Sequence, residues 1–324
     1  MAKDGLFLHL QRLSTEDGPG IRTTVFLKGC FLNCAWCHNP ESISNKVQVQ
    51  HIETTCIHCG TCLSACPQGC LLADENGTIQ INRTECDGCG QCVEACPTGA
   101  MELLGQSISV SALTDILLKD RSYYETSGGG VTFSGGEPAL QADFCATVMS
   151  NLMEAGIHTA LDTCGLASGQ QLLSLLSFTR LVLFDLKLMD PQLHQRYTGV
   201  SNTAILNNLL LVRDTITRQP NTRLWIRTPL IPQATDSRKN LISIGDFLAK
   251  NLPGIIDRWE LCAFNNLCRD KYRRLDLDWN YADTPLFTQT ELDQRLAWAM
   301  ESSFPSEKII LSGASRVNNV IGGE

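Results

Sequence analysis

Short hydrophobic runs alternate with longer helical patterns over most of the chain. The runs are nearly continuous in Val, Ile, Leu and Phe, as expected for strands buried on both faces of a parallel sheet. They predict six strands, at 22–29, 130–135, 158–163, 180–187, 223–230 and 258–264. Helical patterns lie between them, at 110–125, 140–156, 202–216 and 238–250. This alternation predicts an α/β fold, a partial TIM-like barrel of six strand–helix units with its chemistry at the carboxyl ends of the strands.

One segment breaks the alternation between the first strand and its helix. Residues 53–105 contain an internal repeat, in which "CIHCGTCLSACPQGC" starts at Cys56 and "CDGCGQCVEACPTGA" starts at Cys86. We therefore expect three parts: 1–52 as the start of the barrel, 53–105 as a small insert, and 106–324 as the rest of the barrel with a C-terminal tail.

Charge and cysteine content narrow the classes of function. The chain of 324 residues has a formal net charge of -8 and a sequence pI near 5.3, which gives no general attraction to nucleic acid or to an anionic membrane. The first residues lack the apolar stretch of a signal peptide. We expect a soluble, cytoplasmic, monomeric protein. Its sixteen cysteines then indicate metal or redox chemistry, because the cytosol keeps thiols reduced.

The two halves of the insert share the pattern C-x2-C-x2-C-x3-C-P. This is the bacterial ferredoxin run, in which the fourth cysteine ligates the other cluster. It predicts two [4Fe–4S] clusters in a ferredoxin-like insert. One would be held by Cys56, Cys59, Cys62 and Cys96, and the other by Cys86, Cys89, Cys92 and Cys66. A pair of zinc sites is the alternative. Cys70 lies outside the pattern and is interpreted as a small buried packing residue.

A different spacing, C-x3-C-x2-C, occurs in "GCFLNCAWCHNP" at Cys30, Cys34 and Cys37. Three thiolates on a cubane leave one iron open to a substrate. The alternative is a structural cluster that a remote cysteine completes, such as Cys164 or Cys268.

The stretch "CFLNCAWC" resembles the signature of radical S-adenosylmethionine (SAM) enzymes. The resemblance implies a third [4Fe–4S] cluster whose open iron binds the methionine moiety of SAM. The motif "TFSGGEP" after the second strand matches the family's site for the SAM amino group. Carboxylates at the ends of apolar strands need a cationic partner, so a monovalent cation near Asp162 and Asp185 is a further candidate. The candidate cofactor-binding residues are Trp36, Gly135, Gly136, Glu137, Asp162, Thr163, Asp185, Arg227 and Asn265.

A second motif narrows the family. "EDGPGIRTTVFLKGC" (16–30) resembles the segment that marks activating enzymes of glycyl radical enzymes, and "SGGGVTFSGGEP", "DTCG", "DLK" and "RTPLIP" extend the resemblance over nearly the whole chain. Asp17 is held by a Gly-Pro-Gly turn and could orient a peptide backbone. Asp17, Arg22 and Lys187 are the candidate catalytic residues. One departure is Asn265, which stands where these enzymes often have a histidine.

The resemblance implies an anaerobic oxidoreductase. It would cleave SAM reductively to a 5′-deoxyadenosyl radical, which abstracts hydrogen from a backbone glycine of a partner glycyl radical enzyme. The insert would relay electrons from a ferredoxin or flavodoxin. The alternatives are a radical SAM enzyme for a small molecule or another peptide, a polyferredoxin-type electron carrier, and a zinc-bound interaction module.

Overall fold

The computed structural model describes residues 4–219 and 221–316. Its main element is a nine-stranded mixed sheet in the order β13-β12-β11-β10-β9-β8-β2-β1-β7. The strands from β13 to β2 run parallel, whereas β1 and β7 are antiparallel to their neighbours. The bounds are β1 Gly5–Ser14, β2 Arg22–Leu27, β7 Gln106–Ile108, β8 Gly130–Gly135, β9 His158–Thr163, β10 Leu181–Asp185, β11 Arg223–Leu230, β12 Ile256–Ala263 and β13 Ile309–Ser312.

All six predicted strands are confirmed, and 130–135, 158–163 and 223–230 match residue by residue. The sheet also holds three strands that the hydrophobic pattern did not indicate: β1, β7 and β13. These three lie at the sides of the sheet. The C-terminal tail predicted after the last strand falls largely on residues 317–324, which lie outside the described residues.

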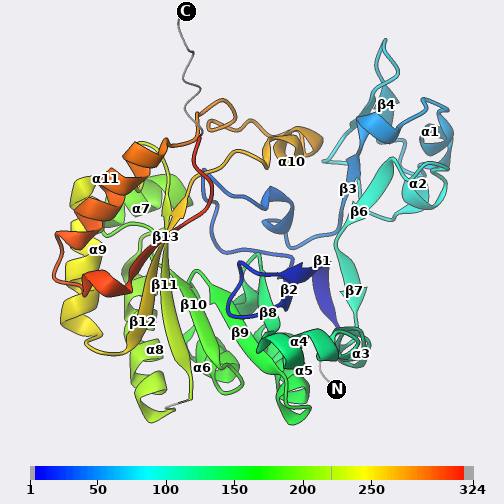
Figure 1. The fold of residues 1–324 in the computed structure, drawn as a ribbon. Helices are drawn as coiled ribbons and strands as arrows, with labels where there is room; N and C mark the ends of the chain where they lie inside the picture. The colour runs from blue at the N-terminus through cyan, green and yellow to red at the C-terminus, as the bar shows by residue number, and fades with distance from the viewer. Residues whose placement is uncertain (1–3, 220, 317–324) are drawn as a thin grey trace, which may run out of the picture.

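Helices cover the outer face of the sheet (Figure 1). The helices outside the insert are α3 Val110–Leu118, α4 Arg121–Ser127, α5 Ala142–Glu154, α6 Gly169–Leu176, α7 Pro191–Thr198, α8 Thr203–Arg218, α9 Arg238–Asn251, α10 Arg269–Arg274 and α11 Gln289–Met300, with short 3-10 turns η1 Pro40–Ser42, η3 Pro138–Gln141 and η4 Ser306–Lys308. Of these, α10 lies above the sheet (Figure 1) and packs against η1, and a further turn, η2 Glu53–Thr55, belongs to the insert. Serine or threonine side chains cap α3, α6, α9 and α11.

The single helix predicted over 110–125 is wrong in one respect, because it is split into α3 and α4. Asp120 lies at the break. Its carboxylate accepts hydrogen bonds from Thr23 Oγ1 at 2.9 Å and from Arg12 Nη1 at 3.0 Å. These bonds tie the junction to the sheet and set the direction of the second helix.

The two faces of the sheet differ in what they bury. Alternate strand residues such as Val131, Phe133 and Leu161 pack against the helices in one large core. The opposite face carries a small apolar cluster of Ala160, Leu181, Leu183 and Trp225. Beyond that cluster, toward the carboxyl ends of the strands, the same face becomes polar, and the candidate site lies there.

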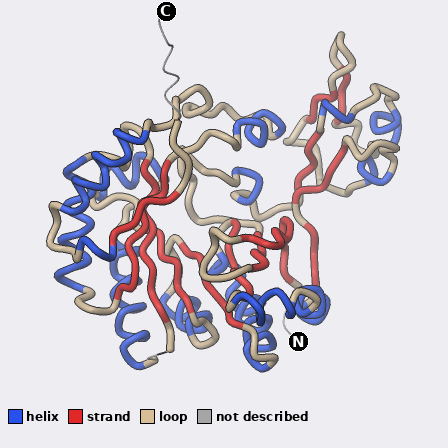
Figure 2. Tube along the Cα trace, viewed as in Figure 1, coloured by secondary structure: helices blue, strands red, loops and turns tan. Residues whose placement is uncertain are grey.

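The insert stands apart from the sheet and has its own strands and helices (Figures 1 and 2). Its elements are β3 Gln48–His51, α1 Thr61–Ala65, β4 Leu71–Ala73, β5 Ile79–Ile81, α2 Gln91–Glu94 and β6 Met101–Leu104, so its first strand precedes residue 53, where the cysteine pattern predicts the start of the insert. β3 pairs antiparallel with β6 at the base, and β4 pairs with β5. A separate apolar cluster, including Val49, Leu71, Ile79 and Met101, forms its interior.

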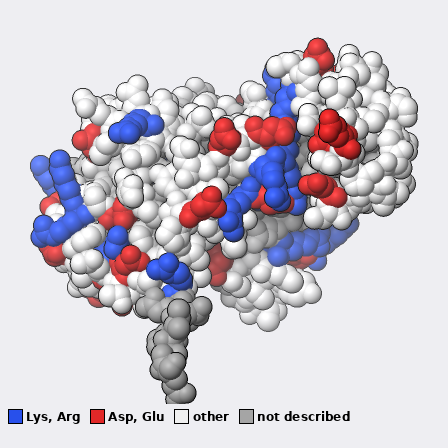
Figure 3. Space-filling view, turned by 90° about the horizontal axis from the view of Figure 1, so that it is seen from above, with Lys and Arg blue, Asp and Glu red and all other residues white. Residues whose placement is uncertain are grey.

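Arg83 ties the insert to the body. Its guanidinium donates to Asp276 Oδ2 at 2.9 Å, to the Arg274 carbonyl at 2.6 Å and to the Val49 carbonyl at 3.0 Å. Seen from above, basic and acidic side chains gather at this junction (Figure 3). The ion pair of Arg274 with Asp270 lies in the same region, on α10.

Candidate functional site

The loop that follows β2 carries Cys30, Cys34 and Cys37 and is held from several sides. The Cys30 amide donates to the Ile43 carbonyl at 3.0 Å, which folds the chain back on itself. Tyr272 Oη donates to the Cys37 carbonyl at 2.8 Å, and Trp279 Nε1 donates to the Ala35 carbonyl at 3.0 Å. Residues from the far end of the chain therefore fix the geometry of the cysteine loop.

The three cysteines line a cavity of about 350 Å³ at the carboxyl ends of the parallel strands. Around the same cavity lie most of the predicted ligand-binding residues. These are Trp36, Gly135, Gly136, Asp162, Thr163, Asp185, Lys187, Arg227 and Asn265. Residues separated by more than two hundred positions thus meet around one space, which is large enough for an organic cofactor.

Two ion pairs line this cavity. Arg227 Nη1 lies 3.6 Å from Asp162 Oδ2, and Ser134 Oγ donates to the same oxygen at 2.6 Å. Lys187 Nζ lies 2.5 Å from Asp185 Oδ2. Each carboxylate therefore has a cationic partner among the protein side chains.

Burial changes the protonation of these groups. It raises the pKa of Asp162 to about 7, and Arg227 only partly opposes this rise. Burial also works against the charge of Lys187, but Asp185 overcomes it and the pKa of Lys187 is raised. The charge of the Asp162 carboxylate therefore changes near neutral pH.

Gly135 and Gly136 are required where they lie. Gly135 has φ of 103°, and a Cβ there would come within 2.3 Å of the Leu27 amide nitrogen. A Cβ on Gly136 would lie 1.9 Å from the Gly29 carbonyl oxygen. The two glycines let β8 approach the start of the cysteine loop, so the "SGGEP" motif and the cysteine motif share one wall.

Glu137 is fully buried and does not line the cavity. Its Oε1 accepts from Thr163 Oγ1 at 2.8 Å and its Oε2 accepts from the Cys164 amide at 2.8 Å. These bonds join the turn after β8 to the end of β9. Glu137 therefore positions Thr163 and Cys164 from behind the cavity wall.

Asp17 and Arg22 also lie outside the cavity wall. The Asp17 carboxylate accepts from Ser14 Oγ at 2.7 Å and from Thr24 Oγ1 at 2.6 Å. Arg22 is fully buried and donates to Thr132 Oγ1 at 2.7 Å and to the Val131 carbonyl at 2.9 Å. Arg22 thus joins β2 to β8 at the amino end of both strands, opposite the cysteine loop.

Several lining residues were not singled out from the sequence as ligand-binding residues. They include Ser134, Cys262, Phe264 and His38, and also Cys164, which the sequence offers only as the remote thiol that would complete a structural cluster. Ser134 has a sequence signal, because it lies two positions after Thr132 and so shares its face of β8. Cys164 lies close enough to Cys30 for a hydrogen bond between their side chains, which lowers the pKa of Cys30. Cys145 is buried in α5 and packs in the large core between the sheet and the helices.

Three thiols from one loop line one cavity, which is a donor set that an iron–sulfur group can use. Burial raises the pKa of Cys34 to about 12 and also raises the pKa of Cys37. Buried thiols of this kind become thiolates only when a metal compensates the charge. The donor set and its setting therefore fit a bound cluster.

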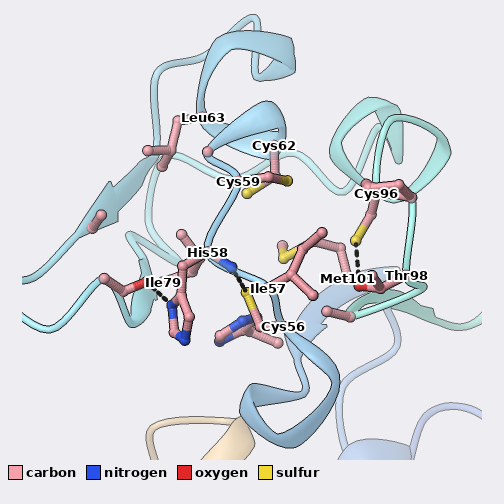
Figure 4. Close-up of a pocket in the computed structure, with 16 residues that line it drawn as sticks. Cys56, Ile57, His58, Cys59, Cys62, Leu63, Ile79, Cys96, Thr98 and Met101 are labelled. Carbon is pink, nitrogen blue, oxygen red and sulfur yellow. Dashed lines mark hydrogen bonds between the residues drawn. The ribbon is translucent and has the colours of Figure 1, made fainter.

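The insert contains two further cysteine-lined cavities. The first measures about 90 Å³ and is surrounded by Cys56, Cys59, Cys62 and Cys96. Figure 4 shows these side chains around the space, with His58 and Met101 beside them. The second is lined by Cys66, Cys86, Cys89 and Cys92, together with Cys70. In each cavity, the fourth cysteine comes from the other half of the repeat. Among the described residues, no group of three or more His, Cys, Asp or Glu side chains is arranged around a single metal ion.

Comparison with known proteins identifies the family. Residues 48–97 match the family described as 4Fe-4S dicluster domain. The chain is 39% identical over 277 residues to the (2S)-3-sulfopropanediol dehydratase activating enzyme of Klebsiella oxytoca, a match that covers 84% of this chain and 86% of that one. It is 41% identical over 271 residues to the trans-4-hydroxy-L-proline dehydratase activating enzyme of Clostridioides difficile, covering 83% and 87%. This chain belongs to the glycyl-radical-enzyme activating enzymes.

A third relative supports this assignment. This chain is 38% identical over 281 residues to the pyruvate formate-lyase 2-activating enzyme of Escherichia coli (strain K12). The match covers 86% of this chain and 83% of the E. coli enzyme. The fold of this chain matches that of a radical SAM methyltransferase from Sphaerobacter thermophilus, with a TM-score of 0.50, 12% identity, and coverage of 94% and 76%. The activating enzyme is thus an iron–sulfur enzyme that uses SAM and acts on a glycyl radical enzyme. In the part of the chain that the structure describes, none of the helices combines the length and apolar character needed to cross a membrane.

Proposed function

We propose that the cavity at the strand ends is the SAM site of this activating enzyme, and that Cys30, Cys34 and Cys37 hold its catalytic [4Fe–4S] cluster. The observation that carries the proposal is the meeting of three thiols from one loop with polar side chains from four strands around one cavity. When bound, the cluster would supply an electron to SAM, yielding methionine and the 5′-deoxyadenosyl radical that takes hydrogen from a partner glycine.

The chain's own residues would bind and orient SAM. Gly135, Gly136 and Thr163 lie on the wall beside the cysteine loop, where the methionine end of SAM would bind. Asp162 and Asp185 offer carboxylates to its cationic groups, and Arg227 and Lys187 keep those carboxylates from standing unpaired. Trp36 and Asn265 line the same cavity, and Asn265 would take over the contact that a histidine often makes.

A monovalent cation near Asp162 and Asp185 stays a prediction. It would have to share these carboxylates with Arg227 and Lys187, so its binding should depend on SAM being present. Comparing SAM affinity in potassium and in tetramethylammonium buffers would test it.

We further propose that the insert binds two [4Fe–4S] clusters, each with three cysteines from one half and the fourth from the other. The ligands would be Cys56, Cys59, Cys62 and Cys96 in the first cavity, and Cys86, Cys89, Cys92 and Cys66 in the second. They would relay electrons from a ferredoxin or flavodoxin. The second cavity includes Val49 in its wall, and Arg83 binds both the Val49 carbonyl and α10 of the body. The second cluster would therefore be the one nearer the body.

The architecture behind this proposal is a partial barrel. Its segments would be 1–52, 53–105 and 106–324, and the cavity would lie within the curve of the six predicted strands. Asp17 would orient the peptide of the glycyl radical enzyme, Arg22 would hold the strand that leads to the cysteine loop, and the activating enzyme would act as a cytoplasmic monomer.

The decisive experiment measures 5′-deoxyadenosine production by the anaerobic, reconstituted enzyme with dithionite and SAM. Wild-type protein should hold about twelve irons, four for each cluster. The Cys30→Ala/Cys34→Ala/Cys37→Ala variant should hold about eight and produce no 5′-deoxyadenosine. Product from that variant would place the site elsewhere.

A second arm of this experiment tests the open iron. Cys164 lines the cavity beside Cys30, so it is the thiol best placed to complete the catalytic cluster as a structural ligand. We expect Cys164→Ala to keep about twelve irons and to keep cleaving SAM. Loss of four irons in Cys164→Ala, as in the triple variant, would show that no coordination site is left for SAM.

A further inference from the structure

The two insert cavities differ by one thiol. Four cysteines surround the first, whereas five surround the second. The additional one is Cys70, which lies outside the ferredoxin spacing and was interpreted from the sequence as a packing residue.

Cys70 lies directly beside a predicted ligand. Its Sγ is 3.4 Å from Cys66 Sγ, and its side chain is buried, with 3% of the residue exposed. This separation is well beyond the sulfur–sulfur bond length of about 2.05 Å. The two thiols are therefore neighbours that reach the same side of the cavity from positions four residues apart.

The repeat supplies an internal comparison for this position. The sequence "CPQGC" that ends in Cys70 corresponds to "CPTGA", which ends in Ala100. Gly69 and Gly99 have φ of 60° and 69°, so the backbone turns in the same way in both halves.

The neighbouring hydrogen bonds also correspond. The Cys70 carbonyl accepts from the Asn82 amide at 2.8 Å, and the Ala100 carbonyl accepts from the Ile52 amide at 2.7 Å. Ala100 is also buried and lines the first cavity. An alanine thus meets the packing demand of this position, and the thiol of Cys70 offers something that packing does not require.

We propose that Cys70 is a second, exchangeable iron ligand of the second insert cluster, able to take the place of Cys66. The proposal rests on the cluster assignment of the insert given above. In the exchange, the bond from iron to Cys66 Sγ breaks and one from iron to Cys70 Sγ forms. The proton of the Cys70 thiol passes to Cys66, and no electron is transferred. The second cluster then survives loss of its fourth ligand, whereas the first does not.

The test removes the equivalent cysteine from each half of the insert repeat and compares the iron content of the two variants, using anaerobically reconstituted full-length protein. Cys66→Ala and Cys96→Ala each remove the fourth cysteine of one run. We expect Cys66→Ala to keep about twelve irons and the electron paramagnetic resonance spectrum of two reduced insert clusters. Cys96→Ala should lose up to about four irons, and so should Cys66→Ala/Cys70→Ala. Equal iron loss in Cys66→Ala and in the double variant would overturn the proposal.

A reciprocal variant covers the case in which Cys66→Ala does not fold. Adding Ala100→Cys to Cys96→Ala places a thiol at the position equivalent to Cys70, and it should restore the lost irons to the first cavity. Failure to restore them in folded protein would count against the proposal. Wild-type protein with only about four irons would instead overturn the cluster assignment itself, so the two failures are distinguishable.

Discussion

The insert and the strand-end cavity bring cysteines together in opposite ways. In the insert, the cysteines of both cavities come from residues 56–96, and for all of them except Cys70 the spacing indicates which would share a cavity. The strand-end cavity takes Cys30, Cys34 and Cys37 from one loop, but its lining residues beyond that loop extend from Ser134 to Asn265. A site whose residues lie close together in the sequence can be transferred to another protein as one segment. A site whose residues come from many strands depends on the whole sheet.

The largest expected effect is on SAM cleavage, and it should depend on the reductant in a different way for variants of the strand-end cavity and of the insert. Cys34→Ala should abolish SAM cleavage with any reductant, because the cavity loses its catalytic cluster. Cys89→Ala should cleave SAM normally with dithionite but fail with a reduced ferredoxin or flavodoxin, because only the relay is broken. Production of 5′-deoxyadenosine with each reductant measures this. Full activity of Cys89→Ala with the protein donor would assign the insert to docking or stability.

The next effect concerns the peptide substrate. Asp17→Asn should lower glycyl radical formation on the partner at least about tenfold, because one charge-assisted hydrogen bond is worth roughly 1.5–3 kcal/mol and about 1.4 kcal/mol is one decade. SAM cleavage should change far less, since Asp17 does not line the cavity.

The exposed neighbour Glu16 supplies the control for this variant. Glu16→Gln should leave both the partner's radical signal, measured by electron paramagnetic resonance, and the 5′-deoxyadenosine yield unchanged. An equal fall of both signals in Asp17→Asn would place Asp17 in cofactor binding or folding instead.

A comparable effect should appear on changing pH. Burial raises the pKa of Asp162 to about 7, so this carboxyl is largely neutral at pH 6 and charged at pH 8. Affinity for the cationic SAM should therefore rise about tenfold from pH 6 to pH 8. Arg227, Asp185 and Asp17 act on the same carboxyl, and Asp162→Asn should flatten the profile.

Ser134 provides a finer control for the pH effect. Its hydrogen bond to Asp162 lowers the pKa of that carboxyl. Ser134→Ala should therefore move the midpoint of the affinity profile to higher pH. Anaerobic calorimetric titration measures both variants, and an unchanged slope in Asp162→Asn would assign the pH dependence to another group.

The smallest effect concerns the junction between the two regions. Arg83→Met removes bonds to Asp276, Arg274 and Val49 and should loosen the insert by roughly 1 kcal/mol, about fivefold in a local equilibrium. Hydrogen exchange over 48–104 should increase accordingly. Arg121→Met, which breaks an exposed pair with Glu125 on α4, should not change exchange in the insert.

Much of the body could be predicted because buried parallel strands are continuous apolar runs. Strands 130–135, 158–163 and 223–230 have such runs and clear ends. β1 was missed because polar residues such as His9 and Gln11 interrupt it, and β7 is too short to show a period. α7 was missed because it buries only His194 and Thr198.

The residues of the candidate site also fall into those that a local pattern marks and those that only the folded structure shows. The residues around the cavity were foreseen where a motif or a strand end marked them, as for Cys30 and Asp185. The roles of Glu137 and Arg22 depend on bonds to residues on other strands, so the sequence did not show that Glu137 lies behind the cavity wall or that Arg22 lies at the opposite end of the strands. The interpretation of Cys70 as a packing residue is incomplete for a similar reason, since folding and not spacing brings its Sγ to within 3.4 Å of Cys66 Sγ.

The pairing of β3 with β6 bears on how such a protein could have arisen. Gln48 lies opposite Leu104, so the chain enters and leaves the insert through adjacent strands, about 5 Å apart. A tight turn could join these two points without moving the body. The segment that encodes the insert could thus be gained or lost in one genetic event, while the strand-end cavity keeps its shape.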